Sequence, residues 1–269
     1  MSPRPCWCAR LLSCSAAAWP QQPPAWWAPR GSRATPSRRR QQTSAEASRL
    51  GLAIVSVSRR RPTRSSLPVP ARLVVLVSGT GTNLQALLDA CRDPAYGAEV
   101  VAVGADRAGT EGVTRAKDAG IDTFEMPVRA YADRAAWDAA LADEVAAYRP
   151  NLVVLAGFMK LVGPDFVARF AGCTVNTHPA LSPSFPGMHG PQDALDYGVK
   201  VSGATLFIVD DGADTGPIIA QTAVSVAADD TADSLHERIK AAERVMLVDV
   251  VGRMICNGYR INGRKVTIS

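Results

Sequence analysis

From residue 72 onward, short apolar runs rich in β-branched residues alternate with segments of helical periodicity, and this alternation most limits the folds open to the chain. The first such runs, with the helical segment that follows each, are 72–79 (RLVVLVSG) then 82–92, and 98–106 (AEVVAVGAD) then 112–120. Strands buried on both faces read as continuous apolar runs, and parallel strands are joined through helices. The pattern predicts an α/β fold: a Rossmann-like, mostly parallel sheet with helices on both faces.

The same alternation continues to the end of the chain. Strands are predicted at 122–128, 151–158, 173–178, 201–210 and 217–226, helices at 132–148, 163–170, 191–198 and 232–255, and a small hairpin at 258–266. Asn262-Gly263 is the predicted turn of that hairpin, since Asn-Gly is a strong hairpin signal. Residues 70–269 are therefore expected to form one domain.

Residues 1–69 differ sharply in composition from this body. They hold twelve Arg and a single acid, Glu46, so their net charge of +11 leaves −6 for residues 70–269 out of the total of +5. The segment is rich in Arg, Pro, Ser, Ala and Gln, which predicts a disordered leader. Three interpretations stay open: a start placed too far upstream, a dispensable extension, or a targeting segment. The acidic body argues against a nucleic-acid groove, which needs clustered cations.

Cysteine usage and hydropathy bear on where the protein works. The six cysteines form no C-x-x-C pair, which favours free thiols in a reducing compartment and a cytoplasmic protein. No run of 18 apolar residues occurs, so no membrane span is predicted and a membrane partner is not expected.

A glycine-rich turn follows the first strand and opens the first helix (VSGTGTNLQALL, 77–88). Backbone N–H groups at a helix N-terminus bind anions, so Gly81, Thr82 and Asn83 are candidate phosphate ligands. Leu84 stands where a dinucleotide fingerprint has its third glycine, and no G-K-[ST] follows. A monophosphate is favoured, although a turn that only serves packing remains an alternative.

The stretch VNTHPALSPSFPGMHG (175–190) carries the strongest chemical signal. Alternation along its strand places Asn176 and His178 on one face at the carboxyl edge of the sheet. An amide beside an imidazole suits stabilisation of an oxyanion and movement of a proton, and Asp214 in the turn DDGADTGP is a carboxylate that could fix the imidazole tautomer. A purely structural histidine is the alternative. His178 and His189 lack a convincing third metal ligand, since the remaining His236 lies on a predicted helix, so no metal is expected.

Taken in order and spacing, four motifs resemble the phosphoribosylglycinamide formyltransferases. They are S-G-x-G-T-N at 78–83, VVLAGFMKLV at 153–162, N-x-H-P-A-L-x-P-x-F-P-G at 176–187, and G-A-T at 203–205 leading to D-x-G-P at 214–217. The resemblance covers residues 72–268 and none of the leader. It implies transfer of a formyl group from 10-formyltetrahydrofolate to the amine of glycinamide ribonucleotide (GAR), without metal, by a monomer or homodimer.

The resemblance also implies roles for individual residues. Asn176 and His178 would bind the oxyanion, Asp214 would orient His178, and Gly81, Thr82, Asn83 and Glu243 would bind GAR. The folate pocket would be formed by Arg134, Phe158, Met159, Lys160, Val162 and Asn176. Three positions depart from common members of the family: Pro191 and Phe207, where some members carry His, and Lys160, where Arg is common.

Three other functions compete with this one. A formyltetrahydrofolate deformylase would share the Asn, His, Asp trio but pass the formyl group to water, and a methionyl-tRNA formyltransferase would add a C-terminal barrel and a basic surface. A non-catalytic nucleotide-binding module would keep the glycine-rich turn but would have no use for the trio.

Overall fold

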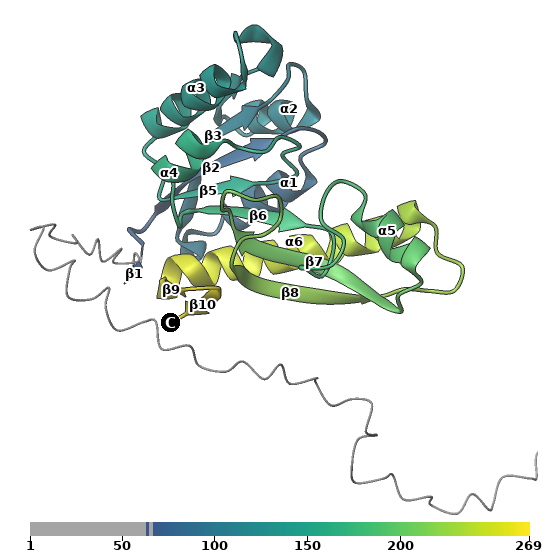
Figure 1. Ribbon diagram of the computed structural model, residues 1–269. Coiled ribbons are helices and arrows are strands. Elements are labelled where there is room, and N and C mark those ends of the chain that lie inside the picture. Colours follow the sequence, from purple (N-terminus) through teal and green to yellow (C-terminus); the bar gives the residue numbers. More distant parts are fainter. Residues whose placement is uncertain (1–62, 65–66) are drawn as a thin grey trace, which may run out of the picture. The chain divides into compact units, whose positions relative to one another are not determined.

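The computed structural model describes residues 63–64 and 67–269, and within them a seven-stranded sheet has the order β4-β3-β2-β5-β6-β7-β8 (Figure 1). Its strands are β2 (Ala71–Val77), β3 (Ala98–Ala105), β4 (Asp122–Glu125), β5 (Leu152–Leu155), β6 (Thr174–His178), β7 (Val201–Ile208) and β8 (Ile218–Ser225). The pairings from β4 through β6 are parallel, whereas β7 runs antiparallel to both β6 and β8. The prediction of a mostly parallel sheet is confirmed.

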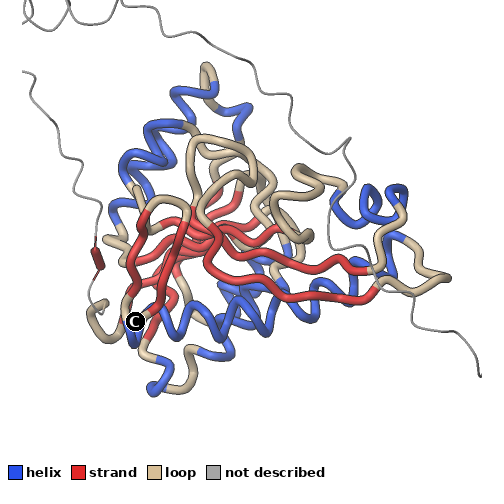
Figure 2. Tube along the Cα trace, turned by 60° about the horizontal axis from the view of Figure 1, so that its bottom comes forward, coloured by secondary structure: helices blue, strands red, loops and turns tan. Residues whose placement is uncertain are grey.

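Helices cover both faces of this sheet. They are α1 (Thr82–Ala90), α2 (Glu111–Asp118), α3 (Arg134–Ala147), α4 (Pro164–Arg169), α5 (Gly190–Tyr197) and α6 (Ala232–Asn257), with short 3₁₀ turns η3 (Pro94–Tyr96) and η4 (Val128–Ala130). Figure 1 shows α3 and α4 on one side of β2, β3 and β5, and α1 and α2 on the other. The long α6 packs against β7, β8 and α1, and Figure 2 shows it running along the sheet.

The core lies between these layers and follows from the continuous apolar strands. All residues of β2 except Arg72 are buried, as are all four of β5. Trp137 on α3 is fully buried and donates its indole N–H to the Met126 carbonyl at 2.8 Å, so its single polar atom is paired inside the core.

The order of the strands brings the turn at 78–81 and the loop at 156–163 to the same edge of the sheet. From β2 the chain moves to β3 and β4 on one side, and from β5 to β6 on the other, so the direction of winding reverses between β2 and β5. In open α/β sheets ligands bind at the carboxyl ends of the strands beside such a switch point. The turn at 78–81 and the loop at 156–163 follow these two strands directly.

A second, three-stranded sheet has the order β1-β9-β10, formed by β1 (Thr63–Arg64), β9 (Tyr259–Asn262) and β10 (Lys265–Ile268). Asn262 pairs with Lys265, so the turn consists of Gly263 and Arg264 and the predicted Asn262-Gly263 turn was wrong by one residue. Gly263 has φ +64° and takes the left-handed conformation itself.

The residues just before the predicted domain boundary take part in this fold. Leu67 is 7% exposed and belongs to the hydrophobic core, and its N–H donates to the Ile255 carbonyl at 3.4 Å. The predictions of disorder, targeting or a misplaced start for residues 1–62, 65 and 66 lie outside the described residues. None of the helices in the described part of the chain has the length and apolar character needed to cross a membrane.

Candidate active site

Asn176 and His178 lie on the same face of β6, two residues apart at its carboxyl end. The antiparallel pairing with β7 sets Asn176 opposite Phe207 and His178 opposite Thr205. His178 is 3% exposed, whereas Asn176 is half-buried. The amide therefore keeps contact with solvent while the imidazole is enclosed.

Both ring nitrogens of His178 face oxygen acceptors. Nε2 lies 2.7 Å from the Phe185 carbonyl oxygen, and Nδ1 lies 3.5 Å from Oδ2 of Asp214. A neutral imidazole carries one N–H, so only the doubly protonated ring can donate toward both acceptors. In this arrangement neither nitrogen is free, and one contact must break before the ring can donate to a bound substrate.

The Pro-rich loop at 179–190 is held in place from both sides of the site. The Ser182 N–H donates to the Thr205 hydroxyl at 2.9 Å, and the Gly187 N–H donates to Oδ2 of Asp214 at 2.8 Å. Asp214 itself has φ +55°, an uncommon conformation for a residue other than glycine. Asp214 thus contacts both the loop and the imidazole through one carboxylate oxygen.

In the glycine-rich turn the backbone at Gly81 passes close to the backbone at Gly112. Gly81 has φ +68°, and a Cβ on it would lie 2.6 Å from the Cα of Gly112, so only glycine fits. α1 begins at Thr82, and no side chain of the described residues caps its N-terminus. The first N–H groups of a helix have no partner within the helix, so this end of α1 is suited to an anion.

Asn83 and Glu243, 160 residues apart in the sequence, meet inside the molecule. The Asn83 side-chain amide donates to Oε1 of Glu243 at 3.0 Å, and the two residues are 8% and 5% exposed. Oδ1 of Asn83 is a buried acceptor with no hydrogen-bond partner among the described residues. The first turn of α1 is thereby connected to the middle of α6.

The loop at 156–163 is attached to the glycine-rich turn. The Met159 N–H donates to the Ser78 hydroxyl at 2.8 Å, and the Ser78 N–H donates to the Gly157 carbonyl at 3.2 Å. Met159 and Leu161 are 54% and 64% exposed. Exposed large apolar side chains at the mouth of a switch point form a surface on which a flat apolar ring can pack.

The structure separates the predicted folate-pocket residues into two groups. Met159 is exposed beside the glycine-rich turn and Val162 is half-buried, but the Phe158 ring is 8% exposed and stacks on Trp137 with centroids 6.3 Å apart. Arg134 lies with its guanidinium 4.3 Å from the centroid of the Trp137 ring and donates to the Leu161 carbonyl. The Phe158 ring therefore belongs to the core, while Arg134 lies beside the loop.

Lys160 has a partner that sequence reasoning missed. Its ammonium lies 3.6 Å from Oδ2 of Asp106, whose side chain is 1% exposed and also contacts Arg107 at 3.3 Å. Asp106 directly follows β3, at the same edge of the sheet as the site, and this position is the sequence signal that could have identified it.

Among the described residues no group of three or more His, Cys, Asp or Glu side chains is arranged to hold a metal ion. His189 is exposed at the N-terminal end of α5, and His236 lies on α6, where burial lowers its pKa. The three histidines thus sit on three separate elements.

Comparison with known proteins identifies the family of this chain. The family model described as "Formyl transferase" matches residues 71–251. A phosphoribosylglycinamide formyltransferase of Mycobacterium tuberculosis is 49% identical over 209 residues, which cover 78% of this chain and 96% of the relative. The chain belongs to the phosphoribosylglycinamide formyltransferase family. The relative of that name in Escherichia coli is 40% identical over 174 residues, covering 65% of this chain and 82% of its own length.

A solved member of the family has the same fold. The crystal structure of glycinamide ribonucleotide transformylase 1 from Symbiobacterium toebii has a TM-score of 0.72 and 43% identity, covering 74% of this chain and 93% of that one. The family match at 71–251 contains every candidate site residue, from Gly81 to Glu243, and begins after the Arg-rich segment.

Proposed function

We propose that this chain transfers the formyl group of 10-formyltetrahydrofolate to the primary amine of GAR, giving N-formyl-GAR in purine biosynthesis. The observation that carries the proposal is similarity to relatives named for this reaction over nearly their full length. At the carboxyl edge of the same sheet, an imidazole contacts a carboxylate and a helix begins without a side-chain cap from the described residues. The enzyme is a one-carbon transferase, and its formyl donor is a co-substrate.

For GAR, the proposed site runs from the turn after β2 to α6. The N–H groups of Gly81, Thr82 and Asn83 would bind the phosphate, because the helix end offers unpaired donors and a positive dipole. Glu243 would accept a hydrogen bond from a ribose hydroxyl. Its Oε1 already receives the Asn83 amide, which leaves Oε2 for the sugar.

The chemical step follows from the groups at the end of β6. The amine of GAR would attack the formyl carbon, and the carbonyl oxygen would become an oxyanion. The Asn176 amide and a protonated His178 would donate to that oxyanion, which stabilises it in an enclosed site. Asp214 would stabilise the imidazolium, and the proton released by the amine would pass through water to N10 of the departing folate as its bond to carbon breaks.

For the folate co-substrate, we assign the loop after β5 and the start of α3. Met159 and Val162 would pack against the flat ring system, and the cations of Lys160 and Arg134 would face the acidic tail. Phe158 would contribute through its backbone, since its ring packs on Trp137. Asn176 would contact the formyl group from β6. No metal is assigned a role.

A direct assay tests this function. Purified full-length protein is mixed with 10-formyltetrahydrofolate, with and without GAR, and folate product is followed by absorbance. Product that forms only with GAR, and equally well in the presence of EDTA, is the expected result. Equal product without GAR would mean hydrolysis, as in a deformylase, and would overturn the proposal. No product from folded protein would favour a binding module.

Two further aspects belong to the same proposal. We place the reaction in the cytoplasm, in line with the absence of a membrane-crossing helix among the described residues, and we expect a monomer or homodimer working on small-molecule partners only. Cell fractionation tests the first, and light scattering of the purified chain tests the second.

A further inference from the structure

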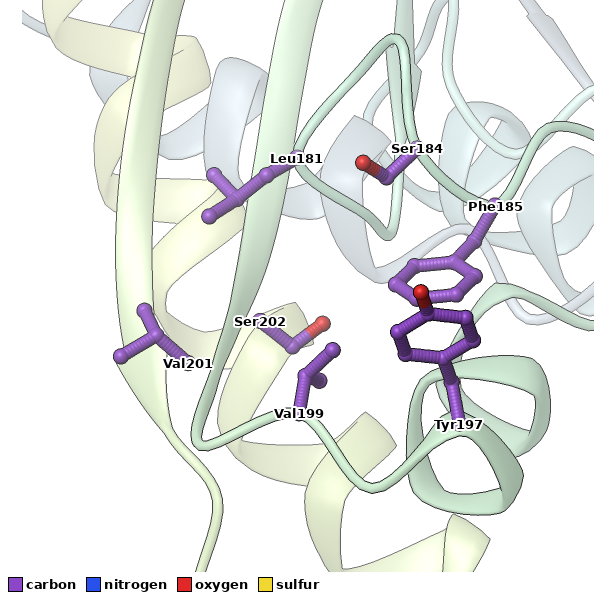
Figure 3. Close-up of a pocket in the computed structure, with 7 residues that line it drawn as sticks. All are labelled: Leu181, Ser184, Phe185, Tyr197, Val199, Val201 and Ser202. Atoms are coloured by element: carbon purple, nitrogen blue, oxygen red, sulfur yellow. The ribbon is translucent and has the colours of Figure 1, made fainter. Parts of the chain in front are cut away.

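A cavity of about 420 Å³ lies between the Pro-rich loop, the end of α5 and the start of β7 (Figure 3). Its volume falls within the roughly 300–1,000 Å³ of small-molecule sites. The apolar part of its lining comes from Leu181, Phe185, Tyr197, Val199 and Val201. None of the groups that we assign to GAR or folate lines it.

The polar part of the lining consists of the hydroxyls of Ser184, Tyr197 and Ser202, and none of the lining residues is charged. Ser202 is 2% exposed, and its hydroxyl oxygen has no hydrogen-bond partner among the described residues. Figure 3 shows the hydroxyls of Ser184 and Ser202 directed toward the space between the three segments. A buried hydroxyl without a partner costs free energy, which a ligand that hydrogen-bonds to it recovers.

We propose that this cavity binds a small uncharged molecule with an apolar ring and one hydroxyl or amide group. The ring would pack against Phe185 and Tyr197, whose own rings meet edge to face with centroids 5.9 Å apart. The polar group would bond to Ser202. A charged molecule is disfavoured because the lining offers no opposite charge to offset its desolvation.

Phe185 connects this cavity to the proposed active site. Its ring lines the cavity, while its carbonyl oxygen lies 2.7 Å from Nε2 of His178. Because one His178 contact must break before the ring can donate to substrate, a ligand that immobilises Phe185 keeps the imidazole occupied. Ligand binding therefore lowers kcat without competing with GAR.

Ligand binding to the cavity is measured directly and does not depend on enzyme activity. A negative result would therefore refute the ligand site without bearing on the proposed formyl transfer. Phenol, and toluene as the analogue without a hydroxyl, are titrated into ¹⁵N-labelled full-length protein and followed by NMR. We expect saturable shifts at the amides of residues 181–185 and 197–202. Ser202→Ala should weaken phenol binding up to about tenfold, the effect of one hydrogen bond, and leave toluene binding unchanged.

Two variants, Val199→Phe and Tyr197→Ala, alter the cavity in different ways. Val199→Phe fills it and should abolish binding of both probes. The control is Val245→Phe, a substitution of the same kind at an exposed position on α6, which should leave binding intact. Tyr197→Ala removes a wall at a residue that is 81% exposed, so the fold is not at risk, and it should also weaken both probes. Circular dichroism checks that each variant is folded.

The outcomes that overturn the proposal are specific. Phenol binding that is absent at millimolar concentration, or that survives both Val199→Phe and Tyr197→Ala, would show that this cavity is not a ligand site. Saturated binding with no change in kcat would refute the coupling of Phe185 to His178. A fall in kcat with an unchanged KM for GAR would support it.

Discussion

At the scale of single residues, the arrangement around His178 determines how the site can act. The Phe185 carbonyl oxygen and the Asp214 carboxylate face its two nitrogens, so an acceptor on each side orients the ring. An imidazole N–H that turns to the formyl oxygen can donate to the developing oxyanion. We therefore propose that His178 stabilises this charge, with water as the carrier of the proton from the amine.

This assignment predicts how kcat responds to substitution. His178→Ala and Asp214→Asn should each lower kcat about 10²- to 10⁴-fold, with KM values changed less than about threefold, because the lost interactions are made in the transition state. Steady-state kinetics with both substrates measures this. Asp211→Asn, an exposed acid of the same turn, is the control and should retain normal kcat. Normal turnover in either site variant would refute the assigned roles.

The sequence was sufficient to predict which residues meet at the carboxyl edge of the sheet. It was not sufficient to predict the contacts that hold their side chains in place. Alternation in β6 put Asn176 beside His178, and the structure also brings Asp214 to the imidazole. The contact of Phe185 could not be predicted, since a backbone carbonyl carries no residue-specific signal. The burial of the Phe158 ring and the pairing of Lys160 with Asp106 depend on the tertiary course of the loop after β5, which periodicity does not encode.

At the scale of elements, α6 is anchored by the acid just before it. Thr231 and Ser234 form a capping box, and the Asp230 carboxylate accepts hydrogen bonds from Arg238, Ser234 and the Ala227 N–H. The pKa of Asp230 is held well below its usual range, first by the Arg238 guanidinium. The Asp230 side chain is 3% exposed. Since α6 also carries Glu243, its N-terminal anchor supports the proposed GAR site.

This shift predicts a pH-dependent contribution to stability. A carboxylate with a lowered pKa in the folded state stabilises that state above its unfolded pKa, about 3.9, and the contribution is lost as pH falls toward the folded value. Asp230→Asn should lower Tm by a few degrees at pH 7, and the difference from wild type should shrink below pH 4. Thermal unfolding by circular dichroism at pH 7 and pH 3 measures it. Asp229→Asn, an exposed neighbour, should show no such difference. A Tm difference for Asp230→Asn that is constant with pH would contradict the linkage.

The elements themselves were predicted from sequence almost throughout. Each predicted strand and helix after residue 70 has a counterpart among the described elements, because buried parallel strands and amphipathic helices differ strongly in periodicity. The errors are at boundaries and register, as at the Gly263-Arg264 turn.

At the scale of the whole molecule, the chain just before β2 belongs with the catalytic fold. β1 pairs with β9, and Leu67 enters the core beside Ile255 at the end of α6. Composition placed this segment in the leader, since its Arg, Pro and Ser content resembles what precedes it. One buried leucine is too weak a compositional signal to move a domain boundary.

This attachment predicts that a substitution in the segment before β2 destabilises the whole fold. Leu67→Ala should lower the free energy of unfolding by about 2 kcal/mol, the lower end of the cost for a buried leucine, because Leu67 lies at the margin of the core. Val69→Ala, two residues away at a position that is 69% exposed, should change it by less than about 0.5 kcal/mol. Urea unfolding of the two full-length variants beside wild type measures both values. Equal stability of the two variants would mean that residues before β2 contribute nothing to the core. A loss of stability in Leu67→Ala but not in Val69→Ala would instead mean that the catalytic domain begins upstream of residue 70. A contact that stabilises the core in a cooperative unfolding transition is part of the folded unit.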